Sequence, residues 1–192
     1  MKLRNDEQGY GAIAQALHWV MAVGVIALFG LGLWMTSLTY YDAWYHRGPY
    51  IHEGIGAFLI AALVFRLLWR IATPTPPDTH LTPLERHASV VVQWGLYGLL
   101  TAIMASGYLI STADGRGLNV FDWFSLPAVI KSKGLEEPAG TAHFYLSMVM
   151  IGLAALHMIA ALKHHFVDRD PTLTRMLPFQ TKTQTTGEDS SP

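Results

Sequence analysis

Four histidines lie inside or at the ends of apolar stretches of this 192-residue chain, at spacings that suit metal or cofactor binding. His143 and His157 are 14 residues apart, close to four whole helical turns, so on one helix both rings face the same way, about 21 Å apart along the axis. His18 and His52 lie in two other apolar stretches. If these stretches are helices that cross a membrane, His52 and His143 lie at the same depth near one surface, and His18 and His157 lie at the same depth near the other. We therefore expect these two pairs.

Two stacked histidine pairs in a helical bundle are what two b-type haems require. Imidazole is a standard axial ligand of haem iron, and bundles build cofactor sites from residues on facing helices. We therefore predict two haem b groups, each held between two imidazoles. A proton or ion pathway through the histidines and Glu53, or a structural bundle, are the alternatives. The chain has no cysteine, which excludes disulfides, iron–sulfur clusters, thiolate zinc sites and covalently attached c-type haem.

Two further residues are candidates for contact with the cofactor. Arg66 follows His52 by 14 residues, so on a helix it faces the interior near the inner pair, where a guanidinium could bind a haem propionate. The alternative is that its side chain snorkels to the interface. His164 follows His157 by seven residues and shares its face, where it could bind a propionate, a quinone carbonyl or water. His87 is an alternative inner ligand.

The elements that must position these residues are four membrane-spanning helices. Hydrophobic residues make up 51% of the chain and charged residues 14%, against about 25% charged in an average soluble domain. Three stretches without Asp, Glu, Lys or Arg exceed the roughly 20 apolar residues that a spanning helix needs. A fourth run carries Glu53 and Arg66 near its ends, and a re-entrant segment is the alternative there. We predict an all-α membrane protein, a four-helix bundle with helices at about 13–37, 50–71, 87–112 and 140–166.

The distribution of basic residues predicts the orientation. Nine Lys and Arg residues lie at the termini and in the 66–86 connection, and four lie in the loops 38–49 and 113–139. The positive-inside rule then places both termini in the cytoplasm. We expect residues 1–178 to form the haem-bearing domain, 179–192 to be a disordered tail, and Val120 to Leu126 to form a short interfacial helix. The net charge of -1 indicates no nucleic-acid partner.

Several stretches resemble the bacterial cytochrome b561 family. They are AQALHWVMA around His18, YIHEGIGAFLIAALVFRLLWR, the TPTPP turn and AHFYLSMVMIGLAALHMIAALKHHFVDRDPTLTRML. The resemblance runs from about Tyr10 to Leu177. It implies a four-helix di-haem protein of the bacterial inner membrane that moves electrons across the bilayer. Its implied axial ligands are His18 with His157 and His52 with His143, the same pairs that the depths predict.

The resemblance also bears on partners. It implies a link to quinone, with ubiquinone as a possible substrate, and one branch of the family oxidises superoxide and reduces ubiquinone. The segments LGLWMTSLTYYDAWYH and GYLISTADG resemble a branch whose members accompany a periplasmic lipocalin-like, lipid-binding protein. The outer side carries four basic against six acidic residues, which does not favour capture of the superoxide anion.

We therefore expect transmembrane electron transfer between the quinone pool and a periplasmic redox partner. Three alternatives stay open. They are a superoxide:ubiquinone oxidoreductase, a haem-bearing anchor subunit of a larger dehydrogenase, and a proton or ion transporter.

Overall fold

The computed structural model describes residues 2–7, 9–77 and 79–177, and the predicted tail at 179–192 lies outside them. Four helices, each long and apolar enough to cross a membrane, form most of the described chain. They are α1 (Ala12–Met35), α2 (Arg47–Ala72), α3 (Pro83–Thr112) and α4 (Glu136–Lys163). The shorter elements are the strands β1 (Leu118–Val120) and β2 (Phe124–Leu126), a π-helical turn η1 (His164–Asp168) and a 3-10 turn η2 (Thr174–Met176).

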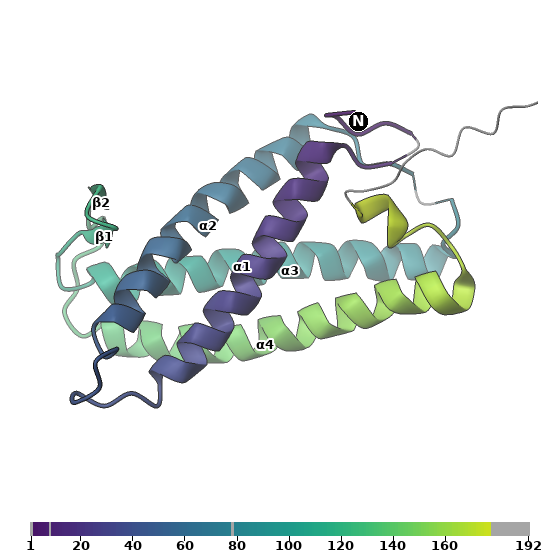
Figure 1. Ribbon diagram of the computed structural model, residues 1–192. Helices are drawn as coiled ribbons and strands as arrows, with labels where there is room; N and C mark the ends of the chain where they lie inside the picture. The colour runs from purple at the N-terminus through teal and green to yellow at the C-terminus, as the bar shows by residue number, and fades with distance from the viewer. Residues whose placement is uncertain (1, 8, 78, 178–192) are drawn as a thin grey trace, which may run out of the picture.

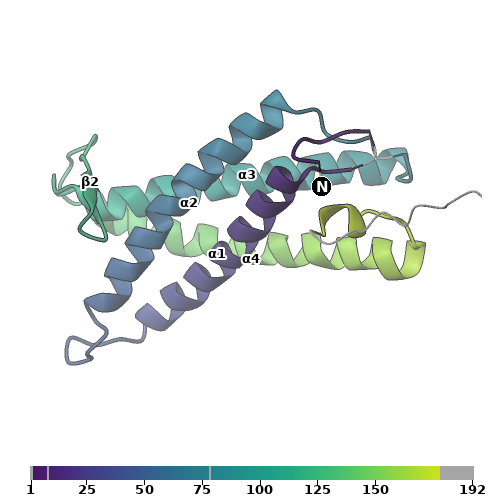
Figure 2. The ribbon, with the colours of Figure 1, turned by 45° about the horizontal axis from the view of Figure 1, so that its top comes forward.

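The helices form two antiparallel pairs. Helix α1 packs mainly on α2 and helix α3 on α4, and the first pair crosses the second at an angle (Figures 1 and 2). All four helices contribute to one buried apolar cluster in the middle of the bundle, made of Met21, Leu28, Leu59, Leu63, Leu100, Ile103 and Met150. Large apolar side chains also cover the outside, as on a surface that faces lipid. We call the end of the bundle at which α1 begins and α4 ends the inner end, and the opposite end the outer end.

Helices α3 and α4 each begin four residues before the predicted ranges, and local capping explains this. At α3, the Thr82 hydroxyl accepts from the Glu85 N–H at 3.3 Å, the Glu85 carboxylate accepts from the Thr82 N–H at 3.1 Å, and Pro83 follows the cap. At α4, Glu136 and Glu137 occupy the first turn, where a negative charge stabilises the helix dipole. A prediction based on charge-free stretches leaves out these charged first turns.

The outer loop contains a β-hairpin, so the prediction of a short interfacial helix there was wrong. Strands β1 and β2 pair antiparallel, and the turn between them holds Phe121 and Asp122 at φ values of 49° and 58°. Both are in the left-handed region, which costs non-glycine residues about 1–2 kcal/mol each. Contacts with α2 offset this cost. The Phe121 ring leaves no room for a Cβ at Gly54, and the Tyr50 hydroxyl donates to Asp122 at 2.9 Å.

The segment after α4 folds back over the inner end of α1. The side-chain amide of Gln15 donates to the carbonyl of Arg175 at 3.0 Å, and the indole N–H of Trp19 donates to the carbonyl of Met176 at 2.8 Å. These bonds satisfy backbone carbonyls near the end of the described chain. They also place the C-terminal segment beside the residues that flank His18.

Candidate functional site

The structure brings together the same two histidine pairs that the sequence predicts. His18 on α1 and His157 on α4 have ring centroids 6.4 Å apart. His52 on α2 and His143 on α4 have centroids 6.1 Å apart. A metal–imidazole bond is about 2.0 Å long and a ring nitrogen lies roughly 1.1 Å from its centroid, so two imidazoles on opposite sides of one ion have centroids about 6 Å apart. Both pairs therefore have the separation that a shared metal ion requires.

At the outer pair, His143 is oriented by a backbone carbonyl. Its Nδ1 lies 3.0 Å from the carbonyl oxygen of Ile103 and 3.2 Å from the hydroxyl of Ser106. Because a carbonyl only accepts, Nδ1 carries the proton and Nε2 keeps a free lone pair. Histidines that bind metals usually donate their other N–H in this way. His143 thus has the tautomer of a metal ligand.

The space around the outer pair fits a flat apolar group. A cavity of about 410 Å³, within the usual range for cofactor sites, is lined by both histidines and by several glycines. A Cβ at Gly32 would lie 3.4 Å from His52, and one at Gly107 would lie 3.1 Å from His143. In the described part of the chain, the buried Nδ1 of His52 has no hydrogen-bond partner, which is unusual for a buried polar atom. These observations fit a haem between the two rings.

The inner pair has a polar neighbour. The side chain of Arg66 is half-buried and lies beside His18. Its Nη2 donates to His18 Nδ1 at 3.1 Å, and its Nε donates to the Tyr97 hydroxyl at 2.8 Å. A histidine that binds iron through Nε2 carries its proton on Nδ1, which can no longer accept from Arg66. The guanidinium then needs another acceptor, for which a carboxylate is well suited.

Sequence reasoning missed three residues beside this pair. Arg70 on α2 donates to the side-chain oxygen of Gln93 on α3 at 2.9 Å. Its guanidinium carbon lies 5.7 Å from the Tyr97 ring centroid. The available signal was a pair of polar residues one turn apart on each of two apolar helices, Arg66 with Arg70 and Gln93 with Tyr97.

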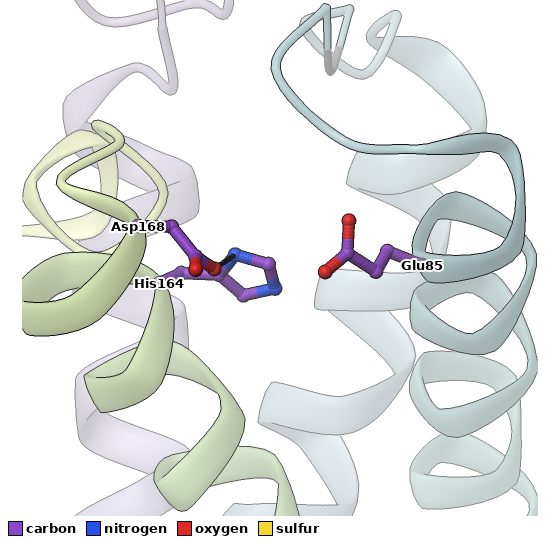
Figure 3. A group of neighbouring side chains, drawn as sticks. All are labelled: Glu85, His164 and Asp168. Carbon is purple, nitrogen blue, oxygen red and sulfur yellow. Dashed lines mark ion pairs between the residues drawn. The ribbon is translucent and has the colours of Figure 1, made fainter.

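His164 faces carboxylates at the inner end. Its Nδ1 lies 2.9 Å from both Asp168 and Asp170, and Figure 3 shows Glu85 of α3 on the facing side. Lys163 bridges Glu85 at 2.9 Å and Asp168 at 2.7 Å. Burial opposes the charge of Asp170, but hydrogen bonds from Thr172 and the nearby His164 hold its pKa below the ordinary value. A further carboxylate, such as a haem propionate, would be repelled by these acidic groups.

The fold and the paired imidazoles define a class, the membrane-bound b-type cytochromes. The comparison with protein families agrees, because residues 9–179 match the model of prokaryotic cytochrome b561. The chain belongs to this family. It is accordingly a multi-pass protein of the bacterial inner membrane that transfers electrons and binds b-type haem.

Two relatives cover nearly the whole chain. Cytochrome b561 homolog 2 of Escherichia coli (strain K12) is 46% identical over 179 residues, which are 92% of this chain and 95% of that protein. A protein of Yersinia pestis named "Probable superoxide oxidase CybB" is 27% identical over 171 residues, which are 88% of this chain and 96% of that protein.

Proposed function

We propose that this protein carries electrons across the inner membrane through two haem b groups, one held by His18 and His157 and the other by His52 and His143. The observation that carries the proposal is the separation of the ring centroids, 6.4 Å in one pair and 6.1 Å in the other. Haem supplies one-electron chemistry when it is bound. Two histidines holding one haem would leave no iron coordination site open for O₂, which supports electron transfer over oxygenation.

The layer between the two pairs supports electron transfer over proton or ion transport. Leu59 on α2 lies midway between His52 and the inner-end Arg66, and Met150 on α4 lies midway between His143 and His157. Both belong to the buried apolar cluster. A proton pathway requires a chain of polar groups or water, whereas this cluster consists of aliphatic side chains and methionines.

The chain's own residues orient the axial ligands and balance charge. The carbonyl of Ile103 holds His143 with Nε2 directed away from the backbone bond. Arg66, displaced from His18 Nδ1 when that nitrogen carries the proton, would bind a propionate of the inner haem. The small residues Gly32 and Gly107 leave the space that the outer imidazole rings occupy.

We further propose that both termini face the cytoplasm, because the inner end carries most of the basic residues. Electrons would then pass between the quinone pool and a periplasmic redox partner, with His164 near a quinone carbonyl at the inner end. A periplasmic lipocalin-like, lipid-binding protein is a proposed partner. The acidic excess of the outer side as a whole, with its helix ends included, supports a partner other than superoxide as the electron donor.

The haem content of purified protein and of two variants tests the proposal. We expect two haems per chain in the unmodified protein, measured by pyridine haemochrome assay against protein concentration. His157→Ala should lose the inner haem and keep the outer spectrum, and His143→Ala should do the reverse. His46→Ala, in an exposed loop position, is the control and should keep both haems. One haem in the unmodified protein, or loss of both haems from each single variant, would contradict the pairing.

A further inference from the structure

Two arginines at the inner end of α2 have no negative partner within the described chain. Arg66 and Arg70 lie one turn apart, and both are half-buried within a membrane-spanning helix. Charged residues in such helices usually pair with an opposite charge. Among the described residues, neither guanidinium lies within ion-pair distance of a carboxylate. Their hydrogen-bond partners, the side chains of His18, Tyr97 and Gln93, carry no negative charge.

Helix α3 holds both guanidinium groups in place. The Tyr97 ring centroid lies 5.6 Å from the guanidinium carbon of Arg66 and 5.7 Å from that of Arg70. The ring centroid of Trp94, which also lies on α3, is 5.5 Å from the guanidinium carbon of Arg70. An arginine has five N–H donors, and these contacts use two from Arg66 and one from Arg70. Each planar fork therefore has donors left for an anion.

We propose that Arg66 and Arg70 together bind the two propionates of the inner haem, with Tyr97 and Gln93 as positioning residues. This inference rests on the proposed function, because it requires a haem at His18 and His157. Arg66 already contacts His18, so the two arginines lie beside the axial ligand. Two cations match the two negative charges of the haem edge. An anionic phospholipid offers similar charge, but the direct contact of Arg66 with His18 favours the haem.

Neutral and charge-conserving variants test the assignment. Arg70→Gln and Arg66→Gln remove one positive charge each, Arg70→Lys keeps it, and Arg47→Gln removes one from the exposed outer end of the same helix. The haems are counted first, and each haem is then titrated potentiometrically. At the midpoint potential of the unmodified inner haem, we expect the ratio of reduced to oxidised inner haem to fall about tenfold in each Gln variant, because the lost charge no longer stabilises the added electron. In Arg70→Lys the ratio of reduced to oxidised inner haem should stay close to that of the unmodified protein, and in Arg47→Gln it should be unchanged.

Several results would overturn the inference. One is an inner-haem ratio that stays unchanged in Arg70→Gln, or that falls equally in Arg70→Lys. The inner haem itself could be lost from both Arg70 variants; its loss from the Gln variant alone would support the charge pairing. Release of bound phospholipid from Arg70→Gln, measured as phosphorus per chain, with no change in the inner haem would assign the arginine to lipid. The haem count distinguishes a failure of this inference from a failure of the proposed function, because fewer than two haems in the unmodified protein contradicts the proposed function itself.

Discussion

Gly107 on α3 provides a test of the outer site, because it faces the ring of His143. A Cβ at this position would lie 3.1 Å from His143 Cε1 and 3.3 Å from Nδ1, whereas ordinary carbon contacts begin at 3.4 Å. Alanine at 107 therefore displaces the ring by about 0.3 Å. Metal–ligand distances tolerate changes of about 0.2 Å, so even this shift strains an iron–imidazole bond. The two further methyl groups of valine increase the overlap, so the displacement exceeds what the bond permits.

We expect Gly107→Val to convert the outer haem from the low-spin to the high-spin form, or to release it, and to leave the inner haem unchanged. Overpacking at this position should also cost about 1–3 kcal/mol of stability. The assay combines haem content, the visible spectrum and electron paramagnetic resonance, in which low-spin and high-spin ferric haems give separate signals. Gly107→Ala should give an intermediate result, with a perturbed low-spin signal.

Gly98 offers a matched control on the same helix, since a Cβ there meets no atom within 4 Å. Gly98→Val should keep both low-spin haems. Two low-spin haems in Gly107→Val, with signals identical to those of the unmodified protein, would refute the assignment of His143 as an outer ligand held against α3. Equal loss in Gly98→Val would show that the effect comes from the helix rather than from the ring contact.

Two other predictions concern stability. Gly54→Ala should destabilise the protein by about 1–3 kcal/mol in thermal unfolding, because its Cβ would lie within 2.8 Å of three atoms of the Phe121 ring and displace the outer hairpin; Gly98→Ala is the control, and equal melting temperatures of the two variants would contradict this packing. The pKa of Asp170 is held below its ordinary value, so its ionised form contributes stability that is fully present above the unfolded-state pKa and is lost as the pH falls through the lower folded-state pKa. Amide protection in residues 164–177, measured by hydrogen exchange relative to the intrinsic rate at each pH, should therefore decrease at acidic pH, less so in Asp170→Asn, and an identical pH response in both proteins would contradict this role.

The two histidine pairs differ in their electrostatic surroundings. The outer ring of His143 contacts a carbonyl and a hydroxyl, both neutral. The inner ring of His18 contacts the Arg66 guanidinium, and Arg70 lies one turn further along α2. Positive charge stabilises the reduced form of a nearby redox group. Arg66 and Arg70 would therefore stabilise the reduced form of a group bound at the inner pair, whereas the two groups that contact His143 at the outer pair are neutral. This asymmetry comes from the placement of the neighbouring side chains, because both pairs consist of histidines.

Local patterns in the sequence were sufficient to predict the four helices and to predict that His143 and His157 lie on the same face of one helix. Long charge-free stretches predict spanning helices because an apolar helix is the form in which a backbone can cross lipid with its polar groups satisfied. The 14-residue spacing of His143 and His157 predicts a common face because it is close to a whole number of turns. The same period placed Arg66 near the inner pair. Each of these inferences uses only the geometry of a single helix.

Tertiary contacts decided what a single helix cannot show. The hairpin after α3 depends on Phe121 packing over Gly54 and on the bond from Tyr50 to Asp122, contacts between residues more than 60 positions apart. The meeting of Arg70 with Gln93 depends on which faces of α2 and α3 come together, and several rotations of two apolar helices satisfy the same hydrophobic pattern. The sequence by itself thus determined four spans and a set of aligned imidazoles, whereas the packing between helices determined the polar neighbours that surround each pair.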